Sequence, residues 1–102
     1  MSKVEFAGYQ CDITFGYYGN TRIAIKLVDP MAGPIVTATI NLPDEDLEGG
    51  YVMIKDYREN AGIKKALIKA GIIGYTYRKI PVGGFGEEYV DVCKLIQGGE
   101  GG

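Results

Sequence analysis

The chain contains no histidine, so the commonest general base and the commonest zinc ligand are both missing. Its two cysteines, Cys11 and Cys93, stand far apart among strand-forming residues. Two distant thiols without other soft ligands do not make a zinc site, and a nucleophilic thiol needs an activating neighbour, which neither cysteine has in the sequence. We therefore expect two buried, reduced cysteines, no metal and no cofactor.

Carboxylates are the remaining catalytic candidates. Asp56 and Glu59 stand near the start of an expected helix, and Glu87, Glu88 and Asp91 cluster beside a late strand. Carboxylate pairs hydrolyse glycosides, and oxygen-rich clusters bind Mg²⁺ or Ca²⁺, but these spacings match no metal-binding loop. We favour helix capping for the first pair and solvated strand faces for the others, so the chain is predicted not to be an enzyme. A carboxylate-dependent hydrolase stays open as a third functional class.

Tyrosine and arginine give the strongest functional signal. The chain has eight tyrosines, and this side chain is enriched in contact surfaces and can stack on nucleotide bases. Arginine binds carboxylate and phosphate. The predicted binding residues combine both types: Tyr17, Tyr18 and Arg22 around a first hairpin, and Tyr75, Tyr77 and Arg78 in a later strand. The alternative is that several of these rings only pack the edges of a sheet.

The N-terminal part that carries the first group has the pattern of a β-meander. Between residues 9 and 17 apolar and polar residues alternate with the period of a half-buried strand. Gly19-Asn20 predicts a hairpin turn because both residues tolerate positive φ. Further strands are expected at 23–27 and 36–42, so three consecutive strands pair antiparallel between residues 4 and 42.

One helix is expected in the middle of the chain. Its apolar stripe recurs at helical spacing in Ile63, Ala66, Leu67 and Ala70. Asn60 is the expected N-cap, and a capping box from Asp56 and Glu59 is the alternative. Gly71 stands where a left-handed residue ends a helix.

The second tyrosine group belongs to a later hairpin. Strand-forming residues fill 75–80 and 89–96, and a Gly-rich loop at 81–86 separates them. The predicted fold is therefore α+β, an antiparallel sheet of five or six strands with one helix packed on one face. Residues 1–96 form a single domain, and residues 97–102 are predicted to be a disordered Gly-rich tail.

Composition excludes several partner classes. The net charge is −2 and the basic residues are scattered, whereas proteins that bind duplex nucleic acid carry a basic stripe. No apolar run reaches the ~18–20 residues of a membrane span, and no secretion signal is recognisable. We expect a cytoplasmic protein without membrane contact, and homodimerisation stays open.

Several short motifs together resemble an uncharacterised family of small proteins encoded by gut bacteria, their phages and their plasmids. The motifs are Ala38-Thr39-Ile40-Asn41-Leu42-Pro43-Asp44, Ile54-Lys55-Asp56-Tyr57, Glu59-Asn60, Gly62, Ala70-Gly71-Ile72, Gly84-Phe85 and Val92-Cys93-Lys94-Leu95. The family supplies no catalytic residue that could be carried over. The resemblance implies a mobile-element product that acts on something in a bacterial host cell.

Three functional hypotheses follow, from different classes. The first is a non-enzymatic binding protein of a phage or mobile element that inhibits a host defence protein. The second is a sponge that sequesters a small nucleotide signal, with tyrosines stacking on the base and arginines holding phosphate. The third is the hydrolase. A deep pocket walled by two tyrosines and an arginine would favour the sponge, and a flat exposed aromatic patch would favour a protein partner.

Overall fold

The computed structural model describes residues 3–84 and 88–96. The predicted tail at 97–102, Glu87 and part of the predicted loop at 81–86 lie outside the described residues. Along the described chain the elements are β1 (Val4–Phe6), β2 (Tyr9–Tyr17), β3 (Ile23–Asp29), β4 (Gly33–Thr37), β5 (Tyr51–Lys55), a 3-10 turn (Arg58–Asn60), α1 (Ile63–Lys69), β6 (Ile73–Val82) and β7 (Glu88–Leu95).

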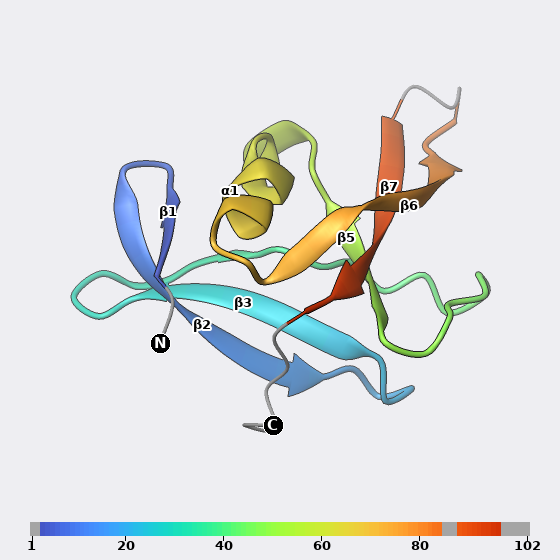
Figure 1. Cartoon of the computed structure of the whole chain (residues 1–102), viewed down its shortest axis with the longest axis horizontal. Helices are drawn as coiled ribbons and strands as arrows, with labels where there is room; N and C mark the ends of the chain where they lie inside the picture. The colour runs from blue at the N-terminus through green and yellow to red at the C-terminus, as the bar shows by residue number, and fades with distance from the viewer. Residues whose placement is uncertain (1–2, 85–87, 97–102) are drawn as a thin grey trace.

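These strands form two antiparallel sheets (Figure 1). The first sheet has the order β1-β2-β3-β4 and the second has the order β5-β7-β6. The helix α1 contacts β1 of the first sheet and both β5 and β6 of the second. The α+β class and the antiparallel pairing are confirmed, whereas the prediction of one sheet with five or six strands is wrong. No helix among the described residues is long and apolar enough to cross a membrane.

The chain passes from one sheet to the other through a crossing segment, residues 38–40. The backbone N–H of Ala38 donates to the carbonyl oxygen of Ile25 in β3 at 2.8 Å, and the carbonyl oxygen of Ala38 accepts the N–H of Lys55 in β5 at 2.9 Å. The N–H of Ile40 then donates to Met53 at 3.1 Å. The expected strand at 36–42 is therefore divided, because its pairing partner changes from β3 to β5. The alternation of apolar residues continues across this change and does not reveal it.

A tight turn separates β1 from β2. The sequence pattern does not show these two segments as separate strands. Ala7 has φ +54° and Gly8 has φ +84°, and two successive positive φ angles are typical of the type I′ turn that suits a two-residue hairpin. Val4 then pairs with Cys11, and both side chains are buried. The resulting hairpin places β1 against α1.

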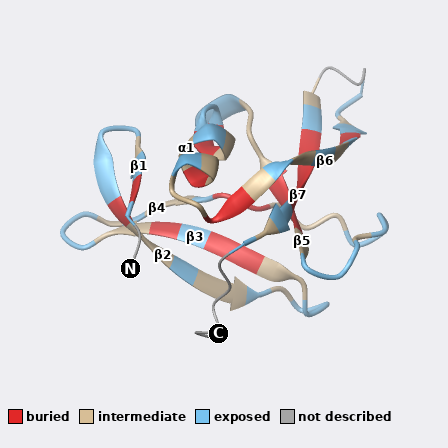
Figure 2. Ribbon diagram, in the orientation of Figure 1, coloured by how far each residue is buried: buried red, intermediate tan, exposed pale blue. Residues whose placement is uncertain are grey.

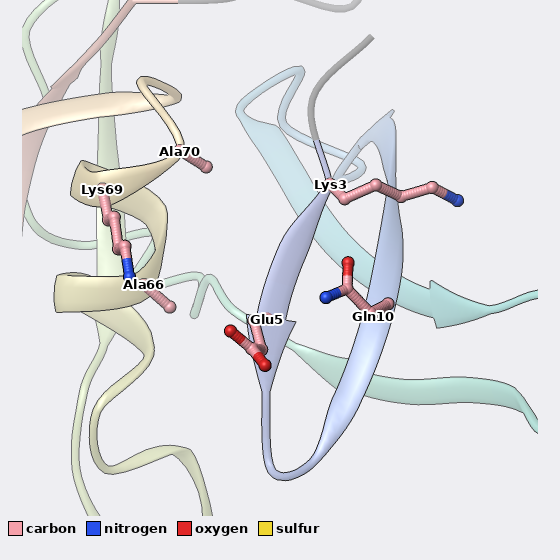
Figure 3. A pocket seen from close by; sticks show the side chains of 6 residues that line it. All are labelled: Lys3, Glu5, Gln10, Ala66, Lys69 and Ala70. Carbon is pink, nitrogen blue, oxygen red and sulfur yellow. The ribbon is translucent and has the colours of Figure 1, made fainter.

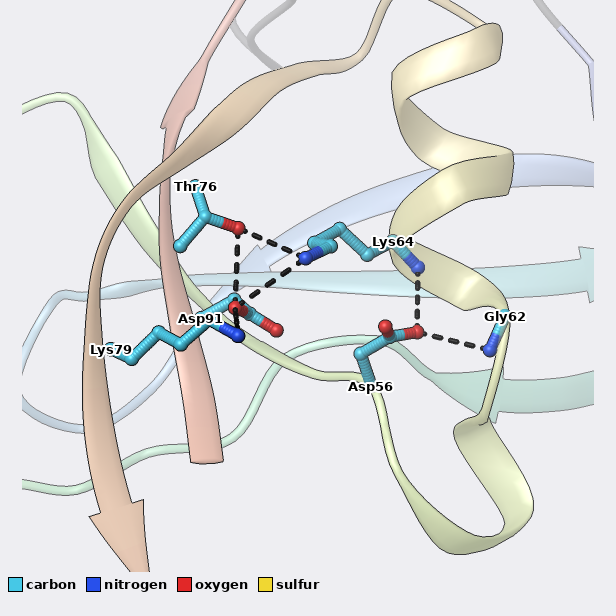
Figure 4. Close-up of polar contacts among 6 residues, drawn as sticks. All are labelled: Asp56, Gly62, Lys64, Thr76, Lys79 and Asp91. Atoms are coloured by element: carbon cyan, nitrogen blue, oxygen red, sulfur yellow. Dashed lines mark hydrogen bonds and ion pairs between the residues drawn. The ribbon is translucent and has the colours of Figure 1, made fainter. Parts of the chain in front are cut away.

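The N-terminus of α1 differs from the prediction. The N-cap is Gly62, and the side chain of Asp56 accepts the backbone N–H groups of Gly62 and Lys64, both at 3.0 Å (Figure 4). Asn60 is buried, and its Nδ2 donates to the carbonyl oxygen of Thr37 at 2.8 Å. Asn60 thus ties the start of the helical region to β4 and is not the cap.

The C-terminus of α1 confirms the role of Gly71, which has φ +77°. Its N–H donates to Ile68 at 3.0 Å, and the N–H of Ile72 donates to Leu67 at 3.0 Å. This pair of bonds is a Schellman motif, which satisfies carbonyl groups at the helix end. Leu67 and Ile63 are fully buried, so the predicted stripe faces the core.

Two apolar clusters hold the fold together (Figure 2). The first lies between the two sheets and α1, and its buried members include Ile25, Leu27, Ile54 and Leu67. The second consists of Met53, Ile80, Val90 and Val92 in the three-stranded sheet. Leu42 and Leu47 pack against this second cluster, so the segment that contains them acts as its cover.

Candidate functional site

The β2–β3 hairpin positions the first group of predicted binding residues. The N–H of Tyr18 donates to the carbonyl oxygen of Arg22, and the N–H of Thr21 donates to that of Tyr18, each at 2.8 Å. Tyr17 ends β2 with 70% of its surface exposed. The Tyr18 hydroxyl instead lies 2.9 Å from Oγ1 of the buried Thr39. Tyr17 is therefore the more accessible of the pair, while the Tyr18 hydroxyl is engaged within the chain.

The two predicted arginines, 56 positions apart in the sequence, hold the same loop, residues 42–48. Arg22 donates from Nη1 to the carbonyl oxygen of Leu42 at 2.7 Å and from Nη2 to that of Glu45 at 2.5 Å. Arg78 donates from Nη2 to the carbonyl oxygen of Asp46. The structure thus brings Arg22 and Arg78 to one loop, and both guanidinium groups are engaged within the chain.

Arg78 also binds the carboxylate of Glu48. Its Nε lies 3.3 Å from Oε2 and its Nη2 lies 3.4 Å from Oε1. A hydrogen bond from the backbone of Glu48 itself, followed by the bond from Arg78, lowers the pKa of this exposed carboxyl below its ordinary value. The loop is therefore fixed at both ends by charged donors.

The second group of tyrosines lies on β6, which pairs with β7 alone in its sheet. Tyr75 is 83% exposed and Tyr77 is 58% exposed. The ring of Tyr77 packs against the ring of Tyr51 from β5, with centroids 5.0 Å apart and planes inclined by 44°, a tilted arrangement that aromatic pairs favour. Irregular register on both sides of Thr76 marks this part of β6.

Two further tyrosines are exposed that the sequence reasoning did not select. Tyr89 on β7 is about half exposed, and Nζ of Lys79 lies 5.7 Å from the centre of its ring. Tyr9 at the start of β2 is also exposed. The alternation pattern predicts Tyr9 and Tyr17 on the inward face of β2, but both end residues extend beyond the core. The hairpin already marks Tyr17 in the sequence, and position at the start of β2 is the signal that would have found Tyr9.

A buried polar cluster lies between α1 and the second sheet (Figure 4). Asp91 on β7 is only 5% exposed, and its Oδ1 lies 3.1 Å from Thr76 Oγ1, 3.5 Å from Lys64 Nζ and 4.0 Å from Lys79 Nζ. Lys64 also donates to Thr76 at 3.0 Å. The cluster compensates a buried carboxylate with two ammonium groups and links α1 to the sheet, as buried charges require.

Asp56, Glu59 and Glu88 also have structural partners, and Glu87 lies outside the described residues. Asp56 caps α1, as described above, while Glu59 binds Lys55 at 2.7 Å, so the two do not form a capping box. Glu88 lies 3.3 Å from Arg58. The expectation of a solvated strand face is wrong for Asp91, because it occupies the interior. Among the described residues, no group of three or more metal-ligating side chains comes together.

Both cysteines lie in the core, as the sequence predicts. Burial raises the pKa of the Cys93 thiol to about 11, and a hydrogen bond with Thr76 opposes this shift only in part. Burial, followed by the nearby Asp29 and Asp12, raises the pKa of Cys11. Protonated thiols are poor nucleophiles, so the geometry favours a packing role.

The described surface is hollowed at several places, and three of these hollows bear on the predicted site. One of about 270 Å³ lies between the β1–β2 hairpin and α1 (Figure 3), lined by Lys3, Glu5, Gln10, Ala66, Lys69 and Ala70. A second of about 160 Å³ lies beside Arg22 and Tyr51. A third of about 400 Å³ lies between the 42–48 loop and the end of β6. The second holds one tyrosine and one arginine and is smaller than the ~300 Å³ at which ligand pockets usually begin.

Comparison of the chain with models of protein families, with curated proteins and with solved structures finds no match.

Proposed function

We propose that the chain is a non-enzymatic binding protein that holds another protein against its exposed tyrosines. The observation that carries the proposal is the exposure of Tyr17, Tyr75 and Tyr77, which are 70%, 83% and 58% exposed. Tyr17 pairs with Ile23 in β3, and Tyr75 and Tyr77 flank Thr76, which pairs with Cys93 in β7. Rigid aromatic side chains give contact area with little conformational entropy to lose.

The structural roles of the chemically capable side chains support binding over catalysis. Asp56 caps a helix, Asp91 is neutralised by lysines, and burial keeps the Cys93 thiol protonated. Among the described residues, each carboxylate that the sequence offers for a hydrolase thus has a partner that accounts for its position. Arg22 and Arg78 likewise hold the 42–48 loop, so the tyrosines are the better candidates for direct contact.

The resemblance stated above supplies the class of partner that we propose. A mobile-element product of this kind acts on a protein of its bacterial host, and a host defence protein is the target that we infer. The nucleotide sponge is the competing function. A sponge needs two tyrosines and an arginine around one pocket. The hollow beside Arg22 has one tyrosine, Tyr51, in its lining.

Affinity capture tests this proposal. The full chain, immobilised, is exposed to bacterial host lysate, and bound proteins are quantified by mass spectrometry for the wild type, Tyr17→Ala, Tyr75→Ala and Met31→Ala. Met31 is the matched control, since it is 95% exposed in the β3–β4 turn, at the opposite end of β3 from Tyr17. Loss of a central aromatic anchor costs about 2 kcal/mol or more, which is about thirtyfold in Kd.

The expected result is one enriched protein that both tyrosine variants lose and that Met31→Ala retains, with melting temperatures nearly unchanged. Equal capture by all four proteins would overturn the proposal. A nucleotide released from denatured chain and identified by mass spectrometry would replace it with the sponge.

A further inference from the structure

The largest of the three hollows is an apolar groove at one end of the second sheet. One wall is the start of the 42–48 loop, with Leu42 and Pro43, and the other is the end of β6, with Ile80, Pro81 and Val82. Leu42 and Val82 are half-buried and pack against the second apolar cluster. The floor of the groove is therefore continuous with the core, which gives it a fixed shape.

The two arginines hold the loop that forms one wall of this groove. They bind the carbonyl oxygens of Leu42, Glu45 and Asp46. Apart from the bond between Arg78 and the Glu48 carboxylate, these contacts are to backbone oxygens, so they leave the carboxylates of Asp44, Glu45 and Asp46 unengaged. No ion pair within the described residues involves Asp44, Glu45 or Asp46, and all three are exposed. The rim of the apolar groove thus carries the two carboxylates of Asp44 and Glu45, with the Arg22 guanidinium bound to carbonyl oxygens of the same wall, so acidic groups outnumber the cation there.

We propose that this groove binds an extended segment of the protein partner in which an aliphatic side chain stands beside lysine or arginine. The inference rests on the proposed function and specifies the chemistry of its partner. The aliphatic group fits between Pro43 and Val82, while the cation meets Asp44 and Glu45. Opposite charges at a rim guide association and discriminate partners, and an acidic segment would be repelled.

Model peptides test this specificity without knowledge of the partner. Three fluorescent probes of equal length alternate leucine with lysine, leucine with glutamate, or serine with lysine, and binding to the full chain is followed by anisotropy. The leucine–lysine probe is expected to bind at least about tenfold more tightly than the other two and to weaken with added salt, since exposed charges are screened. Equal binding of the leucine–lysine and serine–lysine probes would overturn the role of the groove.

A matched pair of charge reversals locates the binding. Glu45→Lys reverses a rim charge, and the backbone carbonyl that Arg22 binds remains. Glu5→Lys makes the same change in net charge on β1, where Glu5 is exposed beside the hollow of Figure 3. Affinity for the leucine–lysine probe should fall about fivefold to tenfold in Glu45→Lys and stay unchanged in Glu5→Lys. An equal loss in both would mean diffuse attraction to an acidic protein and would overturn the proposal.

The outcome can be separated from that of the proposed function. If the probes show no preference while Tyr75→Ala still loses the captured protein, only the groove inference fails. If the probes behave as expected while the tyrosine variants capture the protein normally, the groove inference is supported and the proposed binding by the exposed tyrosines is wrong.

Discussion

Arg22 joins the β2–β3 hairpin to the loop that covers the second apolar cluster, so its truncation is expected to destabilise the chain. A hydrogen bond from a charged donor contributes about 1.5–3 kcal/mol to stability, and Arg22 makes two such bonds to carbonyl oxygens. The side chain is half-buried, so water replaces part of what is lost. We expect Arg22→Ala to lower the free energy of unfolding by about 2 kcal/mol.

Urea denaturation measures this loss, and Arg22→Lys is the control. Lysine keeps the charge but lacks the planar fork that reaches two carbonyl groups at once, so about half of the loss is expected. The amide of Glu45, which donates to Leu42 at 3.0 Å, should exchange with solvent faster in both variants. Arg78→Ala should add less to Arg22→Ala than it costs alone, because the two arginines hold one loop.

An unchanged urea midpoint together with unchanged exchange at Glu45 would refute this reasoning. Arg22 would then be a free surface side chain, as its position beside Tyr17 and Tyr18 indicates from the sequence alone. The same measurement therefore decides whether loss of binding in an Arg22 variant reflects a lost contact or a displaced loop.

The remaining predictions concern packing, thiol chemistry and a turn. Leu67→Ala should cost about 2–5 kcal/mol, as truncation of a buried leucine does, while the exposed Lys65→Ala should cost less than about 0.5 kcal/mol; equal losses in denaturation would contradict the placement of α1. Burial raises the pKa of Cys93 to about 11, so its thiolate is scarce at neutral pH, and iodoacetamide should label neither Cys93 nor Cys11 until urea unfolds the chain. Ala7→Asn should raise stability by about 1 kcal/mol, because asparagine tolerates positive φ and precedes Gly8 in a type I′ turn; a lower melting temperature would argue against that turn.

Features governed by near neighbours could be predicted from the sequence. Gly71 ends α1 because the carbonyl groups that need hydrogen-bond donors at the helix end belong to the preceding turn, close to it in sequence. Leu67 and Ile63 face the core because helical spacing alone places them on one side. The antiparallel hairpin around Gly19-Asn20 follows from a short turn between two alternating segments, although the positive φ in this turn falls on Thr21 and not on Gly19 or Asn20.

Features that depend on distant partners could not be predicted. Asn60 has the residue type of an N-cap, but a carbonyl oxygen of Thr37, 23 positions earlier, takes its side-chain donor. Tyr18 looks like its neighbour Tyr17 until Thr39 binds its hydroxyl. The division into two sheets also escapes the sequence, since period-two alternation is the same whichever sheet a segment pairs with.

Arginine beside tyrosine in the sequence predicts a contact surface, but in the structure the two residue types have different roles. The guanidinium groups of Arg22 and Arg78 turn to loop carbonyls, while Tyr17 and Tyr75 remain in solvent. No local pattern distinguishes an arginine that binds a partner from one that binds its own chain, because the competing acceptors lie 20 or more positions away.

The strand order of the second sheet has a consequence for synthesis on the ribosome. β5 pairs with β7 and not with its neighbour in sequence, so the second sheet cannot close until residues 88–95 have emerged. Both apolar clusters contain residues of β7, Cys93 in the first and Val90 and Val92 in the second, so both are incomplete until then, and a nascent chain with exposed apolar surface is prone to aggregate. We therefore expect chaperones that bind exposed apolar strands to act on this chain before β7 has left the ribosome.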